Sequence, residues 1–230
     1  MELKLATYNI HACIGNDGHF DPFRIAQVIN ELDADIIALQ EVEHHLVNDI
    51  DLLDFLAEQT GMIGIAGPTM FRESRHYGNA VLTRHPVTSH ELLDLSLDSR
   101  EPRGAIKLRL TMGEHQLLVL TTHFGLKPKE RHYQVDQLLN CISELESELD
   151  TTVLMGDLNE WFLWGKTLRR LNAYFDTTPS RKTFPSRFPL FKLDRIWVHP
   201  RQHLLTLDIH NSFLAKKASD HLPLVATIFF

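Results

Sequence analysis

Cysteines, low-complexity segments and long apolar runs are scarce or absent in this chain. Its two cysteines, Cys13 and Cys141, lie far apart and form no CxxC pair, which indicates neither a disulfide framework nor a zinc site. No apolar run approaches the roughly 18 residues that a membrane-spanning helix needs. The opening segment MELKLATYNI also lacks the basic and then continuously apolar regions of a secretory signal. We therefore expect a cytoplasmic protein with reduced thiols and no transmembrane segment.

Repeats and evident linkers are absent as well, and the composition is that of an ordinary globular protein. Apolar residues make up 43% of the 230 residues and charged residues 23%. A chain of this length can bury a substantial core within one large domain. The sequence therefore predicts a single domain over residues 1–230, which we expect to be a monomer.

An excess of positive charge is also missing, because 23 basic residues against 30 acidic ones give a net charge of −7. A surface that coats nucleic acid all over is therefore disfavoured. The charges are unevenly spread: residues 21–60 hold ten acidic residues and one basic residue, whereas residues 160–220 hold eleven basic and five acidic residues. The second region suits contact with an anionic substrate, although an ordinary solvated surface explains these charges equally well.

Alternating and helical periods predict an ordered series of strands and helices. Strands are predicted at LKLATYNI, DIIALQE, NAVLTRHP, TTVLMGD, KLDRIWVHP and HLPLVATIFF, and a hairpin at GAIKLRLTMGEHQLLVLTTHF, turned at Gly113 and Glu114. A helix is predicted to begin at Pro22, with Asp21 as its N-cap. A second helix follows Pro128, with an apolar stripe at Val135, Leu138, Leu139, Ile142, Leu145 and Leu149.

The order of these elements predicts the fold class. Strands and helices alternate and hairpins interrupt them, which favours a layered α/β protein, and at this length a two-sheet sandwich flanked by helices. The segment from Asn172 to Pro189 is rich in Pro, Ser, Thr and Arg and predicts a long loop. Such a loop in a compact domain is often functional.

Polar residues recur where the predicted strands end. They are Asn9, Glu41, His123, Asp157, Asn159, Asp194, Asp220 and His221. Carboxylates and carboxamides form the oxygen-rich sites that Mg²⁺ or Mn²⁺ prefer, and imidazole changes its charge near neutral pH. Each residue alone also has an ordinary explanation, such as the tendency of Gly, Asp and Asn to form turns in GDLN. The complete set is better explained by a hydrolytic site.

Seven motifs carry a resemblance to a known family. TYNIH, LQEVE, GNAVLTRHP, TTHF, GDLNEW, LDRIWV and SDHLPL occur in this order and resemble the endonuclease/exonuclease/phosphatase superfamily, the DNase I-like proteins. The segments EPRGA, ERHYQ and FPSRFPLFKLDRIWV resemble most the small bacterial members of unassigned substrate. The resemblance covers essentially the whole chain. It implies a four-layer α/β sandwich, with two mixed β-sheets packed face to face, helices outside and a site at one edge.

The same resemblance implies a role for each motif residue. Glu41 would be the principal ligand of Mg²⁺ or Mn²⁺, with Asn9 beside it and Asp220 contributing to a metal position. Asp157 would act on the nucleophile or the metal, and Asn159 would hold the scissile phosphate. The family would thus be a divalent-metal-dependent hydrolase of phosphoesters, in which water attacks in line.

Two histidines complete the implied machinery. His221 would act at the phosphate as a general base or as a positively charged stabiliser, and Asp194 would orient its ring. His123 would assist the phosphate or the leaving group. Abasic-site endonucleases commonly place a tyrosine at this last position, so the histidine argues against the DNA-repair branch.

Arg103 in EPRGA is a further candidate, because its planar guanidinium suits a non-bridging phosphate oxygen. A surface ion pair with Glu101 is the ordinary alternative. Arg187 and Arg195 are weaker phosphate-binding candidates that also suit a solvated surface.

The substrate stays open between nucleic acid, a phospholipid headgroup and an inositol phosphate, and both diesters and monoesters fit. The acidic net charge disfavours tight duplex binding. Trp161, Phe162 and Trp164 suit contact with a lipid interface or a base, although such apolar residues more often lie in a core. Peripheral membrane contact therefore also stays open. A catalytically silent phosphate-binding module with the same fold is the alternative to an enzyme.

Overall fold

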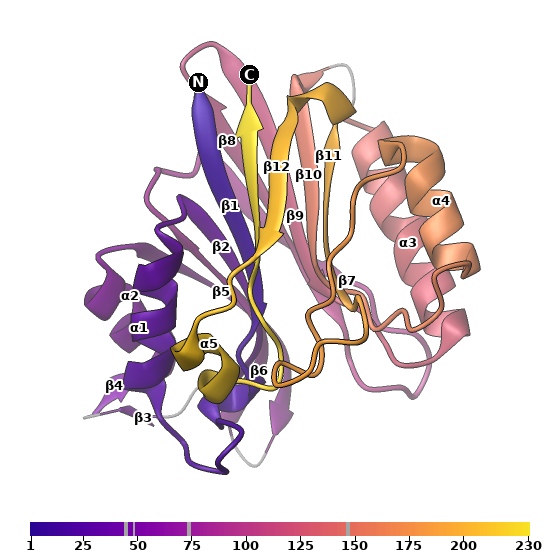
Figure 1. Cartoon of the computed structure of the whole chain (residues 1–230). Coiled ribbons are helices and arrows are strands. Elements are labelled where there is room, and N and C mark those ends of the chain that lie inside the picture. Colours follow the sequence, from indigo (N-terminus) through magenta and orange to yellow (C-terminus); the bar gives the residue numbers. More distant parts are fainter. Residues whose placement is uncertain (44–45, 48, 73–74, 146–147) are drawn as a thin grey trace.

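The computed structural model describes residues 1–43, 46–47, 49–72, 75–145 and 148–230, and it shows two β-sheets packed face to face between outer layers of helices (Figure 1). This arrangement confirms the predicted four-layer α/β sandwich. In the described part of the chain no helix combines the length and the apolar character needed to cross a membrane.

The first sheet is mixed and has six strands in the order β12-β13-β1-β2-β6-β5. Its strands are β1 (Glu2–Asn9), β2 (Ile36–Glu43), β5 (Ile63–Arg72), β6 (Arg75–Thr83), β12 (Leu204–Ile209) and β13 (Leu224–Phe229). β1 and β2 run parallel, whereas the other neighbouring strands pair antiparallel.

The second sheet is also mixed, with five strands in the order β11-β10-β9-β8-β7. Its strands are β7 (Ser89–Asp94), β8 (Gly104–Met112), β9 (His115–His123), β10 (Thr151–Asp157) and β11 (Asp194–His199). β9 and β10 run parallel, and the remaining pairs are antiparallel. The predicted hairpin is confirmed as β8 and β9, and Gly113 at its turn has a φ of +67°.

Three apolar clusters fill the spaces between the four layers. One lies between the first sheet and the helices α1 (Pro22–Leu32), α2 (Leu52–Thr60) and α5 (Phe213–Ala218). Another lies between the two sheets, and the third lies beneath α3 (Pro128–Ser143) and α4 (Lys166–Phe175) on the second sheet. Burial on both faces explains why the central strands consist of nearly continuous apolar residues. The short elements are η1 (His11–Cys13), β3 (Leu46–Val47), β4 (Ile50–Asp51) and η3 (Arg201–His203).

The start of α1 agrees with its sequence signal. Pro22 is its first residue, and the Asp21 carboxylate accepts the backbone N–H of Arg24 at 3.0 Å. Proline loses no hydrogen bond at this position, because the first helical N–H groups have no partner within the helix.

The predicted loop from Asn172 to Pro189 is partly wrong. α4 extends to Phe175, so the irregular segment begins at Asp176. Leu168, Leu171 and Phe175 are buried against the second sheet. This short apolar stripe stabilises a helix that the neighbouring Pro- and Ser-rich sequence conceals.

Other boundaries also differ from the expectations. α3 ends at Ser143, so Leu145 and Leu149 pack against the third cluster from beyond the helix. The predicted strand NAVLTRHP starts earlier and ends earlier, because β6 spans Arg75–Thr83. Helices α2 and α5 and strands β5, β7 and β12 were not predicted.

The two parallel strand pairs explain why polar residues meet. Asn9 at the end of β1 lies opposite Gln40 of β2, and Asp157 at the end of β10 lies opposite His123 of β9. Parallel neighbours leave their sheet at the same edge, and β1 contacts β10 across the sandwich. The four strand ends therefore come together at one edge of the molecule.

Candidate active site

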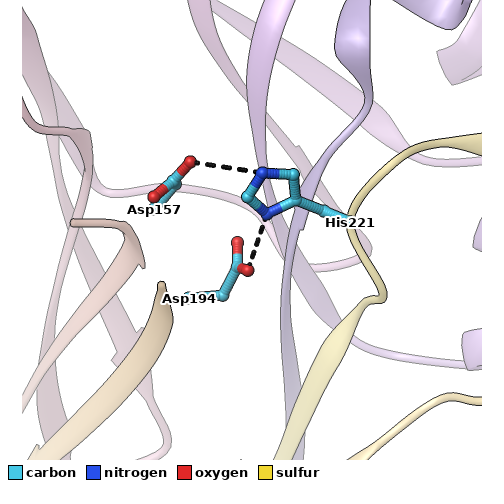
Figure 2. Close-up of side chains that lie close together, drawn as sticks. All are labelled: Asp157, Asp194 and His221. Carbon is cyan, nitrogen blue, oxygen red and sulfur yellow. Dashed lines mark hydrogen bonds and ion pairs between the residues drawn. The ribbon is translucent and has the colours of Figure 1, made fainter. Parts of the chain in front are cut away.

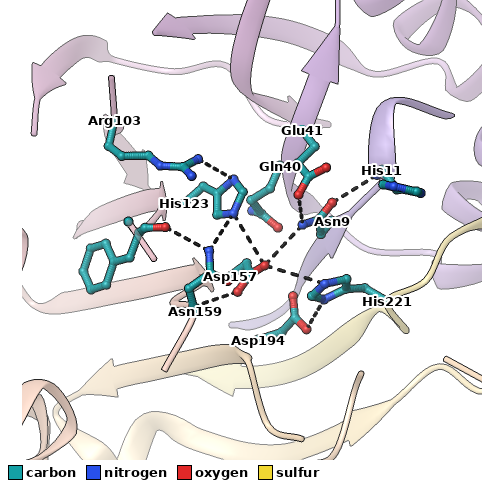
Figure 3. Close-up of polar contacts among 12 residues, drawn as sticks. Asn9, His11, Gln40, Glu41, Arg103, His123, Asp157, Asn159, Asp194 and His221 are labelled. Atoms are coloured by element: carbon teal, nitrogen blue, oxygen red, sulfur yellow. Dashed lines mark hydrogen bonds and ion pairs between the residues drawn. The ribbon is translucent and has the colours of Figure 1, made fainter. Parts of the chain in front are cut away.

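Most of the site residues expected from the sequence lie in or next to the lining of one cavity of about 250 Å³, and Figure 3 shows the polar contacts among them. Those that line it are Glu41, Arg103, His123, Asp157, Asn159 and His221. Asn9 and Asp194 are not lining residues themselves, but each makes a polar contact with a residue that lines the cavity. Asp220 lies outside the lining, with its carboxylate 4.0 Å from Nδ1 of His11 and its side chain 33% exposed.

Asn9 links carboxylates from both sheets. Its amide nitrogen donates to Oε1 of Glu41 at 2.9 Å and to Oδ2 of Asp157 at 3.2 Å, while its carbonyl oxygen accepts the backbone N–H of His11 at 3.0 Å. With its carbonyl engaged by the backbone, Asn9 in this structure orients the two carboxylates.

Glu41 occupies an unusual place in its strand. Its φ is +56°, and the pairing of β2 with β6 shifts register between Leu39 and Val42. Positive φ is uncommon for a residue other than glycine, and such irregularities in pairing re-aim side chains next to functional sites. The bulge thus explains how a residue inside a strand directs its carboxylate into the cavity.

The stretch GDLN forms a turn and a site at once. Oδ1 of Asp157 accepts the backbone N–H of Asn159 at 2.9 Å, and Asn159 has a φ of +48°. Oδ2 of Asp157 lies 3.6 Å from Nε2 of His123 and 3.7 Å from Nε2 of His221. One oxygen therefore shapes the turn, while the other faces the histidines.

Gly156 makes this strand exit possible. A Cβ at that position would lie 1.9 Å from the carbonyl oxygen of Thr122 in the neighbouring strand. Only glycine lets β10 pass so close to β9 while its φ is +152°.

Asp194 and His221 form a buried pair (Figure 2). Nδ1 of His221 lies 2.8 Å from Oδ2 of Asp194, which also accepts a hydrogen bond from the Thr183 hydroxyl. The Phe184 ring lies 4.8 Å from the imidazole, centroid to centroid. These contacts fix the orientation of the ring and direct Nε2 toward Asp157.

The pKa of His221 is raised to about 10. Burial alone disfavours the charged ring, but the carboxylates of Asp194 and Asp157 and the hydrogen bond that the ring donates to Asp194 outweigh it. His221 is therefore an imidazolium at neutral pH.

His123 behaves in the opposite way. Burial, together with the charges of Arg103 and His221, lowers its pKa to about 3, although Asp157 opposes the shift. Its Nδ1 lies 3.2 Å from a guanidinium nitrogen of Arg103, and its Nε2 lies 3.0 Å from the amide nitrogen of Asn159. The two histidines of the site thus carry different charges at neutral pH.

Arg103 makes the ion pair that the sequence offered as the ordinary alternative to a phosphate contact. It pairs with Glu101 at 3.1 Å, and its other terminal nitrogen faces His123. It is 7% exposed and lines the cavity, and its buried Nε has no hydrogen-bond partner among the residues that the structure describes. A guanidinium in the cavity lining suits an oxyanion.

The oxygen donors of the site suit a hard divalent cation. The hydrogen bond from Asn9 engages one of the two carboxylate oxygens of Glu41. The side chain of Glu41 also lines the cavity. Asp157, Asp194 and His221 also bring three potential ligand atoms within 4.8 Å of one another. In this second group the 2.8 Å hydrogen bond engages Asp194 with His221, so Glu41 is the better candidate for a metal ligand.

Sequence reasoning missed several residues of the site. Thr183 and Phe184 hold the pair of Asp194 and His221, and Tyr77, Leu126 and Leu193 line the cavity. Phe184 and Leu193 lie within the quoted segments FPSRFPLFKLDRIWV and LDRIWV, but no role was predicted for either. Thr183, Tyr77 and Leu126 lie outside the quoted motifs, and for Thr183 the composition of its loop was the one functional signal.

The expectation that the tryptophan segment lies in the core is wrong. Trp161 is 41% exposed, Phe162 68% and Trp164 82%. Arg195 also differs from the expectation of a solvated surface, because it is 7% exposed and its Nε donates to the backbone carbonyl of Lys192 at 2.9 Å.

Known proteins share both the sequence pattern and the fold. The profile of the Endonuclease/Exonuclease/phosphatase family matches residues 6–221. The uncharacterized protein YbhP of Escherichia coli (strain K12) is 30% identical over 213 residues, which cover 85% of this chain and 84% of that protein.

Solved structures extend the similarity to the whole fold. An endonuclease/exonuclease/phosphatase of Bacteroides vulgatus is 18% identical with a TM-score of 0.79, covering 100% of this chain and 99% of that one. The mannosyl-6-phosphatase Bt3783 of Bacteroides thetaiotaomicron is 19% identical with a TM-score of 0.76, covering 99% and 100%. The family match confirms the resemblance carried by the seven motifs, and the chain belongs to the Endonuclease/Exonuclease/phosphatase family.

Proposed function

We propose that this protein hydrolyses a phosphoester by in-line attack of water, with the help of Mg²⁺ or Mn²⁺. The observation that carries the proposal is the position of Asp157. Its Oδ2 lies at the strand exits between the amide of Asn9 and the rings of His123 and His221. A carboxylate so placed beside a cation and an amide suits water activation next to an anionic ester.

The reaction needs charge neutralisation, an oriented nucleophile and protonation of the leaving oxygen. Asp157 takes the role of general base, because an imidazolium at His221 cannot accept a proton. His221 instead stabilises charge at the phosphate through Nε2, while Asp194 holds its ring. Asn159 contributes an amide donor to the same phosphate.

His123 and Arg103 serve the other side of the cavity. The neutral ring of His123 hydrogen-bonds the phosphate or the leaving group, and the leaving oxygen takes its proton from solvent. Arg103 binds a non-bridging oxygen. Its position in the cavity lining supports this role, as does its Nε, which has no partner among the described residues.

Glu41 is the principal metal ligand in this proposal, with Asn9 beside it and Asp220 contributing a further oxygen. The ion would neutralise charge on the phosphate and help to orient it. Asp220 lies outside the cavity lining. Substitution of Asp220 is therefore the most specific test of this ligand set.

Substrate hydrolysis tests the proposal directly. The purified chain is incubated with bis(4-nitrophenyl) phosphate and with 4-nitrophenyl phosphate, in Mg²⁺, in Mn²⁺ and in excess EDTA. We expect metal-dependent release of nitrophenolate from at least one ester, and strong loss in Asp157→Asn. Asp208→Asn is the matched control, because this carboxylate is exposed on β12. Binding of phosphate without turnover of either ester would instead support a catalytically silent module.

The organisation of the two sheets supports a single folding unit. Both sheets supply residues to the same cavity, so neither forms an independent unit. We propose a single domain over residues 1–230 that acts as a monomer in the cytoplasm. Light scattering on the purified protein tests the monomer, and a concentration-independent dimer would contradict it.

A further inference from the structure

Large apolar side chains are exposed on the loops around the candidate active site. We call them the aromatic rim: Trp161, Phe162 and Trp164 on the loop after β10, Phe188 and Phe191 on the loop before β11, and Phe213 at the start of α5. Trp164 is 82% exposed, Phe188 77% and Phe213 87%. Contiguous exposed apolar groups of this size are unusual on a soluble surface and mark an interaction site.

The rim is continuous with the catalytic cavity. Trp161 lines the cavity and packs edge-on against Phe191 with ring centroids 4.8 Å apart. It also packs edge-on against Phe184, which contacts the ring of His221. A surface that covers the rim therefore lies next to the reacting groups.

A buried ion pair holds the tryptophan loop in place. Arg131 of α3 is 2% exposed and contacts both carboxylate oxygens of Glu160, at 3.2 and 3.3 Å. Oε1 of Glu160 also accepts the backbone N–H of Phe162. The loop thus presents its aromatic residues from a fixed base.

Cations accompany the rim. A hollow of about 490 Å³ is lined by Phe188 and Phe213 together with Arg187, Lys216 and Lys217. Asp17 is its one acidic lining residue, and this carboxylate already pairs with Arg24 and Lys217. Positive charge beside exposed aromatic rings complements an anionic surface.

The composition of the rim favours a lipid surface over a nucleic acid. Leu163 and Leu190 are 49% and 61% exposed within the same loops, and an aliphatic side chain offers no ring on which a base can stack. Tryptophan prefers the interface between water and lipid, because its ring is amphipathic.

We propose that the aromatic rim docks on a phospholipid bilayer that contains anionic lipids, and so places the cavity at the level of the headgroup phosphoesters. This inference deepens the proposed function and rests on it for the substrate class alone. Docking itself needs no turnover, so it can be measured in the presence of EDTA.

Vesicle binding tests the proposal. The full chain is sedimented with vesicles of phosphatidylcholine alone and of phosphatidylcholine mixed with phosphatidylglycerol, at low and high salt and in EDTA. We expect binding to the mixed vesicles that weakens with salt. Brominated lipids should quench tryptophan emission, which the rim residues Trp161 and Trp164 would report, because the third tryptophan, Trp197, is 2% exposed in the core.

Substitutions test which residues of the aromatic rim and its neighbouring cations contact the bilayer. Phe162→Ser with Trp164→Ser should weaken the partition by about tenfold or more, because two large apolar rings leave the interface. Arg187→Gln with Lys216→Gln should weaken binding to mixed vesicles alone, by about fivefold for each cation. Phe229→Ala is the control, because this 54% exposed residue ends β13 next to the C-terminus, and Figure 1 shows the C-terminus at the opposite end of the sandwich from α5. Thermal unfolding verifies that each variant is folded.

Two results would overturn the proposal. One is the absence of vesicle binding by the folded parental chain. The other is binding that Phe229→Ala weakens as much as the rim variant does. If the first result is accompanied by binding of single-stranded oligonucleotides that depends on the rim, the same surface is assigned to nucleic acid. Hydrolysis of soluble esters together with absent vesicle binding would leave the proposed function standing and remove the docking.

Discussion

Nδ1 of His221 lies 2.8 Å from Oδ2 of Asp194, and both side chains are almost completely buried. The two residues come from different sheets, since Asp194 begins β11 and His221 precedes β13. The pair therefore joins the two halves of the sandwich at the site, and its geometry depends on the fold as a whole.

The first prediction concerns the coupling of this pair. If Asp194 acts only by holding and charging the ring of His221, the effects of removing either residue are strongly non-additive. The double alanine variant should be little slower than the slower single variant. Single-turnover rates of the folded variants measure this, and independent multiplication of the two losses would contradict a coupled pair.

The second prediction concerns the charge of His221. Its pKa is raised from 6.5 to about 10, so the folded chain binds this proton more tightly than the unfolded chain. The resulting stabilisation is fully present below about pH 6.5 and is lost as the pH rises through the folded-state value. NMR titration of the metal-free protein should show a ring that stays protonated well above neutral pH.

Asp194→Asn provides the matched comparison for that titration. Loss of the carboxylate removes the main attraction for the proton, so the pKa of His221 should fall. His123 should show no protonation near neutral pH in either protein, because its pKa is lowered to about 3. A ring of His221 that titrates near its ordinary value in the parental protein would contradict the account.

The third prediction separates the turn and the chemistry of GDLN. Asparagine replaces aspartate well in such turns, so Asp157→Asn should keep the fold. Loss of the general base should nevertheless lower kcat by about 10² to 10⁴-fold, and Asn159→Ala should lower it by about 10²-fold through loss of an amide donor. Rates at saturating substrate and metal measure both effects, and thermal unfolding verifies the fold. Near-parental rates in folded variants would indicate that GDLN is only an ordinary turn.

The fourth prediction concerns the buried pair of Arg131 and Glu160. Removing one partner leaves the other charge buried and unpaired, so Arg131→Met should destabilise the fold by about 3 to 5 kcal/mol. Replacing both residues with apolar side chains should cost less. Urea denaturation measures the free energy of unfolding, and an equal or larger loss in the double variant would contradict the argument.

The sequence predicted the architecture and much of the site for a shared reason. Parallel strand pairs bring their ends to one edge, so the polar residues Asn9 and Asp157 identified both strand exits and the place where the exits meet. Local signals also located α1, since Asp21 and Pro22 act within a single helical turn.

Properties that depend on packing between distant segments were harder to predict from the sequence. The exposure of Trp164 and the burial of Arg195 depend on which neighbours cover them, and apolar character alone assigned Trp164 to the core. Thr183 reaches Asp194 only because the loop before β11 folds back over the site. The charge of His221 likewise follows from carboxylates on two other strands, β10 and β11.

The most direct test of the central claim is the metal dependence of phosphoester hydrolysis by the parental chain and by Glu41→Gln. The account predicts that EDTA abolishes hydrolysis, that Mg²⁺ or Mn²⁺ restores it, and that Glu41→Gln requires much more metal for half-maximal rate. Glu114→Gln, at the exposed turn between β8 and β9, should behave like the parental protein. Full turnover in excess EDTA, or an unchanged metal requirement in folded Glu41→Gln, would contradict the account.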